Sequence, residues 1–334
     1  MSKFQRFTSL ESLAHVHRGQ DFFDKKAVVY YGAKIKLHGT NGAVRVTPDG
    51  EVIAQSRSAD ITSAADNAGF ARWVESTATD WAGIAQGDGD VVVYGEWAGK
   101  GIQKGDAVTM LDHKYFFVFG ILLVASDTFM IAPQAIELVC PDLDDVVVLP
   151  WDTVFPAPLD YADAESCAAF ADRLNDDIIE IGESDPFIFG MFGVDGPGEG
   201  WVVSPICNAF QEPTAGNTMA IDMHWYRTLA FKVKTAAHSV KKTKAAPTVI
   251  EVPENVTEFA AMFVTEARCE QGVYEIVGYA DPKFTGDFLK WIGQDIKKES
   301  VLELADAGLE WKDVTKAVTN AAKTWWLERC KKIT

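Results

Sequence analysis

A strand that runs directly into a hairpin constrains the fold of this chain more than any other feature. Residues 27–37 (AVVYYGAKIKL) are rich in β-branched and aromatic side chains, and Lys34, Lys36 and His38 alternate with apolar residues at the end of the run. Because successive side chains of a strand point to opposite faces, these polar groups share one face. The hairpin that follows consists of the segments 43–46 (AVRV), 47–50 (TPDG, the turn) and 51–55 (EVIAQ).

The rest of the chain up to Lys244 is mixed and lacks the regular βαβ alternation of a doubly wound sheet. A capping box at Thr8–Glu11 predicts that a short helix begins there. The periodicity predicts further strands at 90–97, 115–124, 201–204 and 229–235, and helices at 65–83 and 160–182.

The pattern changes after residues 241–254, a polar stretch with two prolines. Beyond it, apolar residues at i, i+3, i+4 spacing predict helices at 255–268 and 313–330, and we expect Trp325 and Trp326 of the last helix to pack in a core. The chain is therefore predicted to have three parts: a larger mixed domain (1–244), a linker (245–254) and a helical domain (255–334).

Composition excludes several classes of protein. The five cysteines are scattered and form no CxxC pair, which argues against a disulfide framework or a zinc site and favours a reducing cytoplasm. No segment has the pattern of a signal peptide or of a membrane span. The net charge of −17 argues against a nucleic-acid partner, but it is an average over the surface. A local basic track can still bind phosphates, and its members are Lys232, Lys234, Lys241, Lys242 and Lys244.

The segment that begins at Lys36 (KLHG) has the pattern K-x-x-G, which is weak by itself because it recurs at Lys283 and Lys290. The features that follow it in order strengthen the pattern. They are Arg57, expected on a strand after the hairpin; Glu96 in YGEWAGKGIQKG; Phe117 and Phe119 in an aromatic strand; Glu199 just before a strand; and Lys232 and Lys234 on one face of a strand.

In this order the segments KLHGTN, QSRS, YGEWAGKGIQKG, YFFVFGI, EGWVV and FKVK resemble the six motifs of the covalent nucleotidyltransferases. More narrowly, they resemble the RNA ligase 2 family, the double-strand RNA ligases of T-even bacteriophages, whose N-terminus is similar to FQRFTSLESL. The resemblance implies an α+β fold. Its first domain would be an ATP-grasp-like nucleotidyltransferase domain of antiparallel sheets with flanking helices, followed by a small all-helical C-terminal domain.

The resemblance also implies an ATP-dependent RNA ligase that seals 3′-hydroxyl/5′-phosphate nicks in duplex RNA. A lysine attacks the α-phosphate of ATP, the AMP moves to the RNA 5′-phosphate, and the 3′-hydroxyl then displaces AMP. Mg²⁺ would assist the departure of pyrophosphate. The implied enzyme is a cytoplasmic monomer (in the host cell if phage-encoded) without membrane contact. Its partner is nicked double-stranded RNA, and the use of RNA/DNA hybrids stays open.

By the same resemblance Lys36 is the nucleophile. Because a free lysine has a pKa of about 10.4, its amine is protonated at neutral pH and cannot attack. We expect Lys232 and Lys234, together with partial desolvation, to lower that pKa and to neutralise the α-phosphate. The other implied roles are phosphate contact by Arg57 and Asn41, phosphate contact or turn capping by His38, ribose binding by Glu96, adenine stacking by Phe119 (or Phe117), and metal binding by Glu199.

Two positions depart from the family pattern. The family usually has Glu immediately before the nucleophile, where this chain has Ile35, so backbone at Ile35 would have to read the base. The family also tends to have Asp after the stacking Phe, where this chain has Gly120. Both departures put nucleotide affinity or preference in doubt rather than the attack itself.

Two other functions fit parts of the pattern. A DNA ligase or a GTP-using capping enzyme belongs to the same superfamily, but these enzymes typically carry a small β-barrel after the last lysine motif, where this chain is predicted to be helical. A nucleic-acid-binding protein without catalysis is the other alternative, and the complete set of charged residues weighs against it.

Overall fold

The computed structural model describes the chain except residues 1–3, 9, 21–24, 86, 236, 239–255, 277–279, 301–303, 305–308 and 332–334. The chain divides into two compact units, Met1–Thr235 and Ala236–Thr334. The predicted boundary at residue 244 and the linker 245–254 lie outside the described residues. Both units agree with the α+β expectation, because the first combines antiparallel sheets with helices and the described part of the second is helical.

A four-stranded antiparallel sheet, here called the small sheet, holds the nucleophile candidate. Its strand order is β10 (Thr153–Val154), β2 (Tyr31–Lys36), β12 (Gly200–Pro205) and β14 (Phe231–Lys234). Odd-numbered apolar residues of β2 and β12 pack into a core that includes α5 (Ala164–Glu183), whose apolar stripe is Phe170, Leu174, Ile178 and Ile181. The opposite face of β2 carries the lysines, as the alternation predicted.

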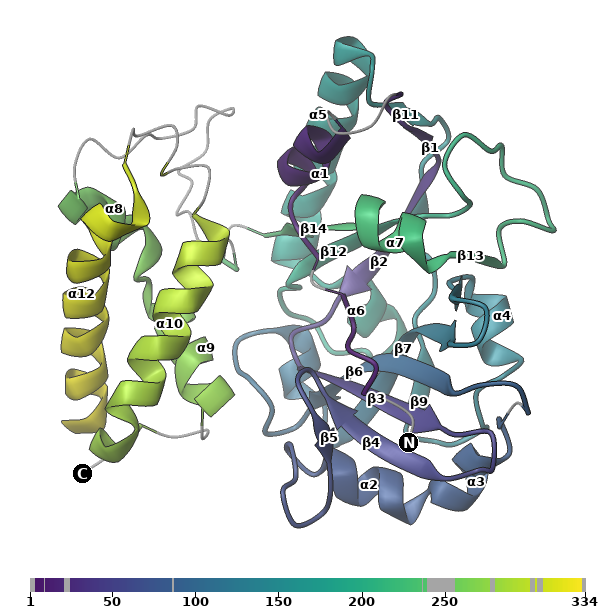
Figure 1. Ribbon diagram of the computed structural model, residues 1–334, viewed down its shortest axis with the longest axis horizontal. Coiled ribbons are helices and arrows are strands. Elements are labelled where there is room, and N and C mark those ends of the chain that lie inside the picture. Colours follow the sequence, from purple (N-terminus) through teal and green to yellow (C-terminus); the bar gives the residue numbers. More distant parts are fainter. Residues whose placement is uncertain are drawn as a thin grey trace. The chain divides into compact units, whose positions relative to one another are not determined.

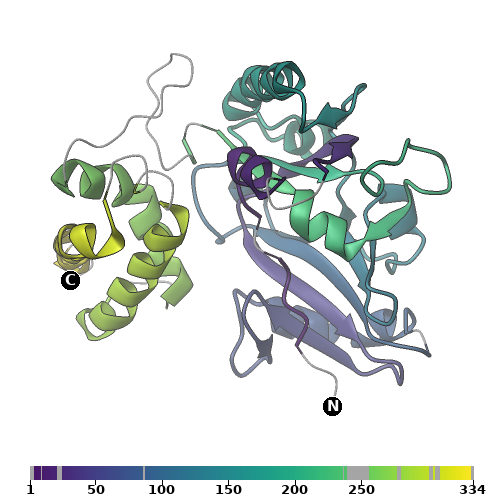
Figure 2. The same cartoon turned by 45° about the horizontal axis from the view of Figure 1, so that its top comes forward.

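A second sheet, here called the large sheet, follows β2 directly. Its strand order is β13 (Ala220–Asp222), β8 (Thr128–Met130), β7 (Lys114–Leu123), β6 (Val91–Gly99), β3 (Thr40–Val46), β4 (Val52–Ser56) and β5 (Asp60–Ile61), and β9 (Val146–Val148) pairs with β7 in parallel. The hairpin β3–β4 was predicted from the turn at 47–50. Figures 1 and 2 show α2 (Phe70–Ser76) and α3 (Ala78–Ala82) on the outer side of this sheet.

The remaining elements of the first unit close its edges. They are α1 (Leu13–Gly19), the pair β1 (Val28–Val29) and β11 (Leu159–Asp160), the 3₁₀ helix η2 (Ala107–Met110), α4 (Pro133–Glu137), α6 (Pro186–Phe192) and α7 (Met223–Leu229).

Three local predictions in the first unit were wrong. The first helix begins at Leu13 rather than at Thr8, because residue 11 is extended and its carbonyl accepts a hydrogen bond from the backbone N–H of Lys232 at 2.9 Å. The predicted helix 65–83 begins only at Phe70 and is divided into α2 and α3. Arg57 lies in the bend after β4 rather than on a strand.

The described part of the second unit is a helical bundle. It contains α8 (Val256–Phe263), α9 (Glu266–Ile276), the 3₁₀ helix η3 (Pro282–Phe284), α10 (Thr285–Glu299) and α12 (Trp311–Lys331). The predicted helix 255–268 is broken between α8 and α9, where the Thr265 hydroxyl accepts from the N–H of Arg268 at 3.3 Å. Trp326 is fully buried and Trp325 packs against the same core, as expected. Among the described residues, no helix is both long and apolar enough to cross a membrane.

Candidate active site

The K-x-x-G segment is the connection between the two sheets. Lys36 is the last residue of β2, and β3 of the large sheet begins at Thr40. A side chain at Gly39 would lie 2.6 Å from the Trp97 carbonyl oxygen and 2.7 Å from the Ala98 side chain, so only glycine lets the turn pass this close to β6. The pattern therefore places the lysine at the point where the chain leaves one sheet for the other.

The other two K-x-x-G matches have no such geometry. Lys290 and Gly293 both lie within α10, and Lys283 precedes Gly286 at the start of the same helix. The pattern thus has a site-like structural context only at Lys36.

Glu199 lies between two lysines that come from different strands. In the small sheet Gly200 pairs with Lys36 on one side and with Lys234 on the other. The Lys36 ammonium donates to Glu199 Oε2 at 2.5 Å, and the Lys234 ammonium lies 3.1 Å from Oε1. Glu199 is almost fully buried, where an unpaired carboxylate would be unfavourable. The two lysines neutralise its charge, one at each oxygen.

Gly200 makes this arrangement possible. Its φ angle is +143°, and a Cβ there would lie 2.1 Å from the Val233 carbonyl oxygen. Only glycine allows the two strands to approach at this residue. The Glu-Gly pair therefore places the carboxylate and keeps both neighbouring strands in register.

The prediction that the surroundings of Lys36 lower its pKa is wrong. Burial would lower the Lys36 pKa, but the carboxylates of Glu199 and Glu96 outweigh burial, so the pKa is raised. The same contact lowers the Glu199 pKa, since Lys36 and Lys234 overcome the effect of its burial. The prediction considered the cations and desolvation but no carboxylate, whereas the Glu199 carboxylate contacts the Lys36 amine directly.

Glu96 on β6 is the second carboxylate of the site. Burial raises its pKa to about 7, Lys36 opposes that shift and Glu199 adds to it. Its side chain accepts a hydrogen bond from the backbone N–H of Gly39 at 3.2 Å. Glu96 therefore contacts the turn that carries the chain away from Lys36, and it can accept further hydrogen bonds.

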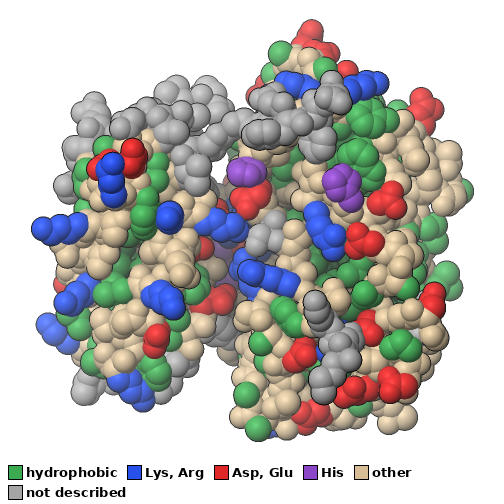
Figure 3. Space-filling model, in the orientation of Figure 1, with side chains coloured by type: hydrophobic (Ala, Val, Ile, Leu, Met, Phe, Trp, Pro, Cys, Tyr) green, Lys and Arg blue, Asp and Glu red, His purple; other side chains and the backbone are tan. Residues whose placement is uncertain are grey.

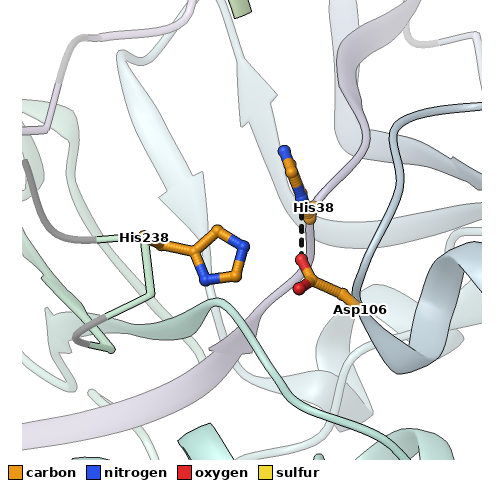
Figure 4. A group of neighbouring side chains, drawn as sticks. All are labelled: His38, Asp106 and His238. Carbon is orange, nitrogen blue, oxygen red and sulfur yellow. Dashed lines mark hydrogen bonds and ion pairs between the residues drawn. The ribbon is translucent and has the colours of Figure 1, made fainter. Parts of the chain in front are cut away.

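His38 lies in the same turn and pairs with a buried aspartate. Its Nδ1 is 2.7 Å from Asp106 Oδ2, next to η2 (Figure 4). His238, also labelled in Figure 4, belongs to the second unit. Nothing in the sequence indicated that Asp106 is the partner of His38, because the two residues are 68 positions apart in the chain.

Asn41 and Arg57 flank the same end of the large sheet. Asn41 is opposite Glu96 in the β3–β6 register, and its amide donates to the Gly95 carbonyl at 3.5 Å. Arg57 is exposed, yet its charge influences both Lys36 and Glu96. Exposure leaves its guanidinium available to a phosphate.

A β-bulge distinguishes the two candidate stacking residues. In the β6–β7 ladder Tyr94 pairs with Gly120 and Gly95 pairs with Val118, so Phe119 is the extra residue. Phe117 is fully buried in the core, whereas Phe119 is only partly buried. Phe119 is therefore the better placed of the two to meet a ligand, and its ring centroid is 4.9 Å from that of Phe7.

The structure explains the departure at Gly120 and shows where the Ile35 side chain lies. A side chain at Gly120 would lie 2.1 Å from the Phe129 ring, so this ring fills the space of the missing aspartate. Ile35 lines a cavity of about 150 Å³ whose other walls are Leu149, Pro150, Trp151, Asp152, Pro186 and Phe187.

Lys232 and Lys34 complete the row next to Lys36. Both pair with Val202 in the small sheet, Lys34 from β2 and Lys232 from β14. Directly opposed residues share a face, so both lysines belong to the same face as Lys36 and Lys234. The sequence analysis gave no role to Lys34, although its alternation with Ile35 placed it on this face.

The donor set fits a hard divalent cation. Glu199 and Glu96 offer carboxylate oxygens, the ligands that Mg²⁺ and Mn²⁺ prefer; Glu199 contacts Lys36, and Glu96 contacts the backbone of the turn that follows Lys36. The residues present are therefore compatible with the Mg²⁺ that the resemblance implies.

Comparison with known proteins finds a family model and several solved structures that are similar to this chain. A model of the RNA ligase family matches residues 30–205, which is more than half of the 334 residues. Solved structures of the Naegleria gruberi RNA ligase align with 71% of this chain and 58% of theirs. A variant with ATP and Mn is 14% identical with a TM-score of 0.45, and a variant with AMP and Mn is 13% identical with a TM-score of 0.45. The structure with PPi, of equal coverage, is 15% identical with a TM-score of 0.42.

The chain thus spans less than two thirds of the length of these solved chains. No curated protein sequence matches it significantly. The family model covers β2, the turn at Gly39, β6, β7 and the Glu199–Gly200 pair, and β14 with Lys232 and Lys234 follows the matched residues. The chain belongs to the RNA ligase family.

Proposed function

We propose that this protein is an ATP-dependent RNA ligase of the phage double-strand type, which seals nicks in duplex RNA through a covalent lysyl-AMP on Lys36. One observation carries the proposal: the Lys36 amine lies at the junction of the two sheets, paired with a buried carboxylate that a second lysine also contacts. Nucleotidyl transfer depends mainly on positioning and electrostatics, and this arrangement supplies both.

In the first step Lys36 Nζ, having released its proton to water, forms a bond to the α-phosphorus of ATP while the bond to the pyrophosphate breaks. Lys234 and Lys232 lie on the same face and neutralise the developing charge on the α-phosphate. Arg57, His38 and Asn41 hold phosphate oxygens near the start of β3.

The remaining residues of the site hold the nucleoside and the cation. Glu96 accepts a ribose hydroxyl, the ring of Phe119 stacks on adenine, and backbone at Ile35 contacts the base edge. Glu199 holds a divalent cation, Mg²⁺ in the cell. When bound, such a cation supplies positive charge beside Lys36, which lowers the amine pKa and favours departure of the pyrophosphate.

In the later steps the AMP passes to the 5′-phosphate at the nick, and the 3′-hydroxyl then attacks that phosphate and releases AMP. The second unit contacts the sugar-phosphate backbone of the duplex through exposed lysine side chains. Examples are Lys290 and Lys297 on α10 and Lys316 and Lys323 on α12. Recognition by the shape and 2′-hydroxyls of A-form RNA is the expected mode, and a monomer is sufficient for it.

The test is covalent labelling. The protein is incubated with α-labelled ATP and Mg²⁺, denatured, and examined for label on the chain. We expect label in the parent and none in Lys36→Ala. Lys283→Ala is the matched control, since it removes another K-x-x-G lysine, one that lies in the 3₁₀ helix η3, and it should be labelled as strongly as the parent.

Equal labelling of Lys36→Ala, or an unlabelled parent, would refute the assignment. Parallel reactions with GTP, and with nicks in DNA as well as RNA, separate the related enzymes. Stronger labelling by GTP would indicate a capping-type enzyme, and sealing of DNA nicks alone would indicate a DNA ligase.

A further inference from the structure

Lys34 is a buried lysine without a carboxylate partner among the described residues. Its residue exposure is only 3%. Its ammonium lies over the Trp151 ring, 4.9 Å from the ring centroid, and donates one hydrogen bond, to the carbonyl oxygen of Phe119 at 3.0 Å. It lies two residues before Lys36 on the same strand face, yet none of the chemical steps above uses it.

The hydrogen bond of Lys34 joins the two sheets at one specific residue. Lys34 belongs to β2 of the small sheet, and Phe119 belongs to β7 of the large sheet. Phe119 is the bulged residue, which has no partner in the β6–β7 register. A bulged residue is held less firmly by its ladder than its neighbours are, so a side chain that binds its carbonyl restricts where the ring can point.

This placement is unfavourable for stability. Burial lowers the Lys34 pKa to about 7, because no nearby carboxylate among the described residues compensates for the removal of water. Both the amine and the ammonium have N–H groups, so the bond to Phe119 persists in either protonation state. A buried polar group that destabilises the fold is a candidate for a role in function.

We propose that Lys34 is a positioning residue: it holds the backbone of Phe119 and so fixes the ring on which the purine base of the nucleotide stacks. This inference rests on the proposed function, in which Phe119 contacts the base. According to this proposal, part of the affinity for the nucleotide base depends on Lys34. The usual family side chains at positions 35 and 120 are absent, since this chain has Ile35 and Gly120 there. The Trp151 ring also contacts the Lys34 amine.

The experiment measures the adenylylation rate as a function of ATP concentration in Lys34→Met, which keeps an unbranched apolar side chain and removes the donor. We expect KM for ATP to rise about tenfold or more, the effect of removing one hydrogen bond to a charged group. The rate at saturating ATP should stay within about threefold of the parent, since Lys36 and Glu199 are untouched. Lys34→Arg, which retains a donor, should restore most of the affinity.

Lys25→Met is the matched control. Lys25 also lies over an aromatic ring, that of Phe210 at 5.0 Å, but it is exposed and outside the site. Its KM for ATP should equal that of the parent. A higher KM in Lys34→Met then cannot be a general effect of losing a contact between a lysine and an aromatic ring.

A double-mutant cycle with Phe119→Ala separates positioning from general damage. If Lys34 acts through Phe119, Lys34→Met has little further effect on KM once the ring is absent. An unchanged KM in Lys34→Met, a loss confined to the saturated rate, or two additive effects would each overturn the proposal.

If Lys34→Met does not fold, as judged by its unfolding transition, Lys34→Gln takes its place. The glutamine amide ends one bond short of the Phe119 carbonyl, so the same increase in KM is expected. Failure of the proposed function is distinct from all these outcomes, because the parent itself would then take up no AMP.

Discussion

The chemistry of single residues at this site is dominated by Glu199. Its two oxygens contact ammonium groups from two strands, and this interaction influences the protonation of Lys36, the proposed nucleophile. Since the Lys36 pKa is raised, the amine keeps its proton at neutral pH until the carboxylate is engaged elsewhere. If Lys36 is the nucleophile, as proposed above, its activation depends on what competes with it for Glu199.

Replacing Glu199 by Gln is expected to lower the Lys36 pKa, because the neutral amide no longer stabilises the ammonium. The pKa can be followed by NMR titration of ¹³C-methylated lysines, with Lys36 assigned by its absence in Lys36→Ala. Glu212→Gln, a change at an exposed loop position, should leave the Lys36 signal at the parent value. A Lys36 pKa that is equal or higher in Glu199→Gln would contradict the electrostatic account.

Lys34 predicts a pH dependence of stability. Its folded-state pKa, about 7, lies below the unfolded value of 10.5, so the unfolded chain binds more protons between these two values. The parent should therefore gain stability as pH rises from about 7 toward 10, and the penalty of the buried charge is fully present below about pH 7. Lys34→Met lacks this penalty, so its stability relative to the parent should fall over the same interval.

Urea unfolding of both proteins from about pH 6 to about pH 9 measures this difference. Lys25→Met should follow the parent at every pH, because Lys25 is exposed. A stability difference between Lys34→Met and the parent that does not change with pH would show that Lys34 is not a buried titrating group.

At the scale of elements, two backbone features decide where the functional side chains lie. The close approach of β12 and β14 at Gly200 places Glu199 between two lysines. The bulge in β7 separates Phe119 from Phe117, although a regular strand would put both on one face. Strand alternation alone could not distinguish these two rings, since a bulge depends on the partner strand.

Gly200→Ala should destabilise the protein by about 2 kcal/mol or more, because the new methyl group would overlap the Val233 carbonyl and φ is positive there. It should also reduce adenylylation, since Glu199 moves with the strand. Urea unfolding and labelling with ATP measure the two effects. Gly216→Ala, at an exposed position with no atom within 4 Å of the added Cβ, should change neither. A stable and fully active Gly200→Ala would refute this role for the glycine.

On the scale of the whole molecule, the negative charge is unevenly distributed. Of the 31 Lys and Arg residues, 14 lie in residues 236–334, against 15 of the 48 Asp and Glu residues. The second unit therefore has a formal charge of −1, and the first has −16. Figure 3 shows Lys and Arg side chains distributed over the visible face of the second unit. A protein with a charge of −17 can thus offer a nearly neutral unit with exposed lysines to RNA.

The combined variant Lys290→Ala/Lys297→Ala should bind nicked duplex RNA more weakly. The slope of log affinity against log salt concentration should become shallower by about one for each phosphate that the variant no longer neutralises. Labelling with ATP should stay at the parent level, because both lysines lie on α10 of the second unit. Binding titrations at several salt concentrations measure the slope.

Lys312→Ala is the control for this variant, since Lys312 is paired with Glu310 at 2.7 Å. Its affinity for nicked RNA and its salt dependence should equal those of the parent. An unchanged affinity and slope in the double variant would exclude α10 from the surface that binds RNA.

The sequence by itself determined the local chemistry and the elements that carry it. Alternation placed Lys34 and Lys36 on one face of a strand, the turn at 47–50 predicted the hairpin after them, and helical spacing predicted the fold of the C-terminal region. These are short-range properties, because periodicity and turn chemistry depend on neighbours in the chain.

The tertiary structure decided what those side chains meet. Only the pairing of β2 with β12 shows that Glu199, 163 positions away, lies beside Lys36 and raises its pKa. The sequence had predicted that nearby lysines would lower this pKa. The Asp106 partner of His38, the bulge at Phe119 and its bond to Lys34 likewise join segments that are far apart in the chain. The electrostatic energy of a charge depends on distances in space and on burial, and a linear pattern contains neither.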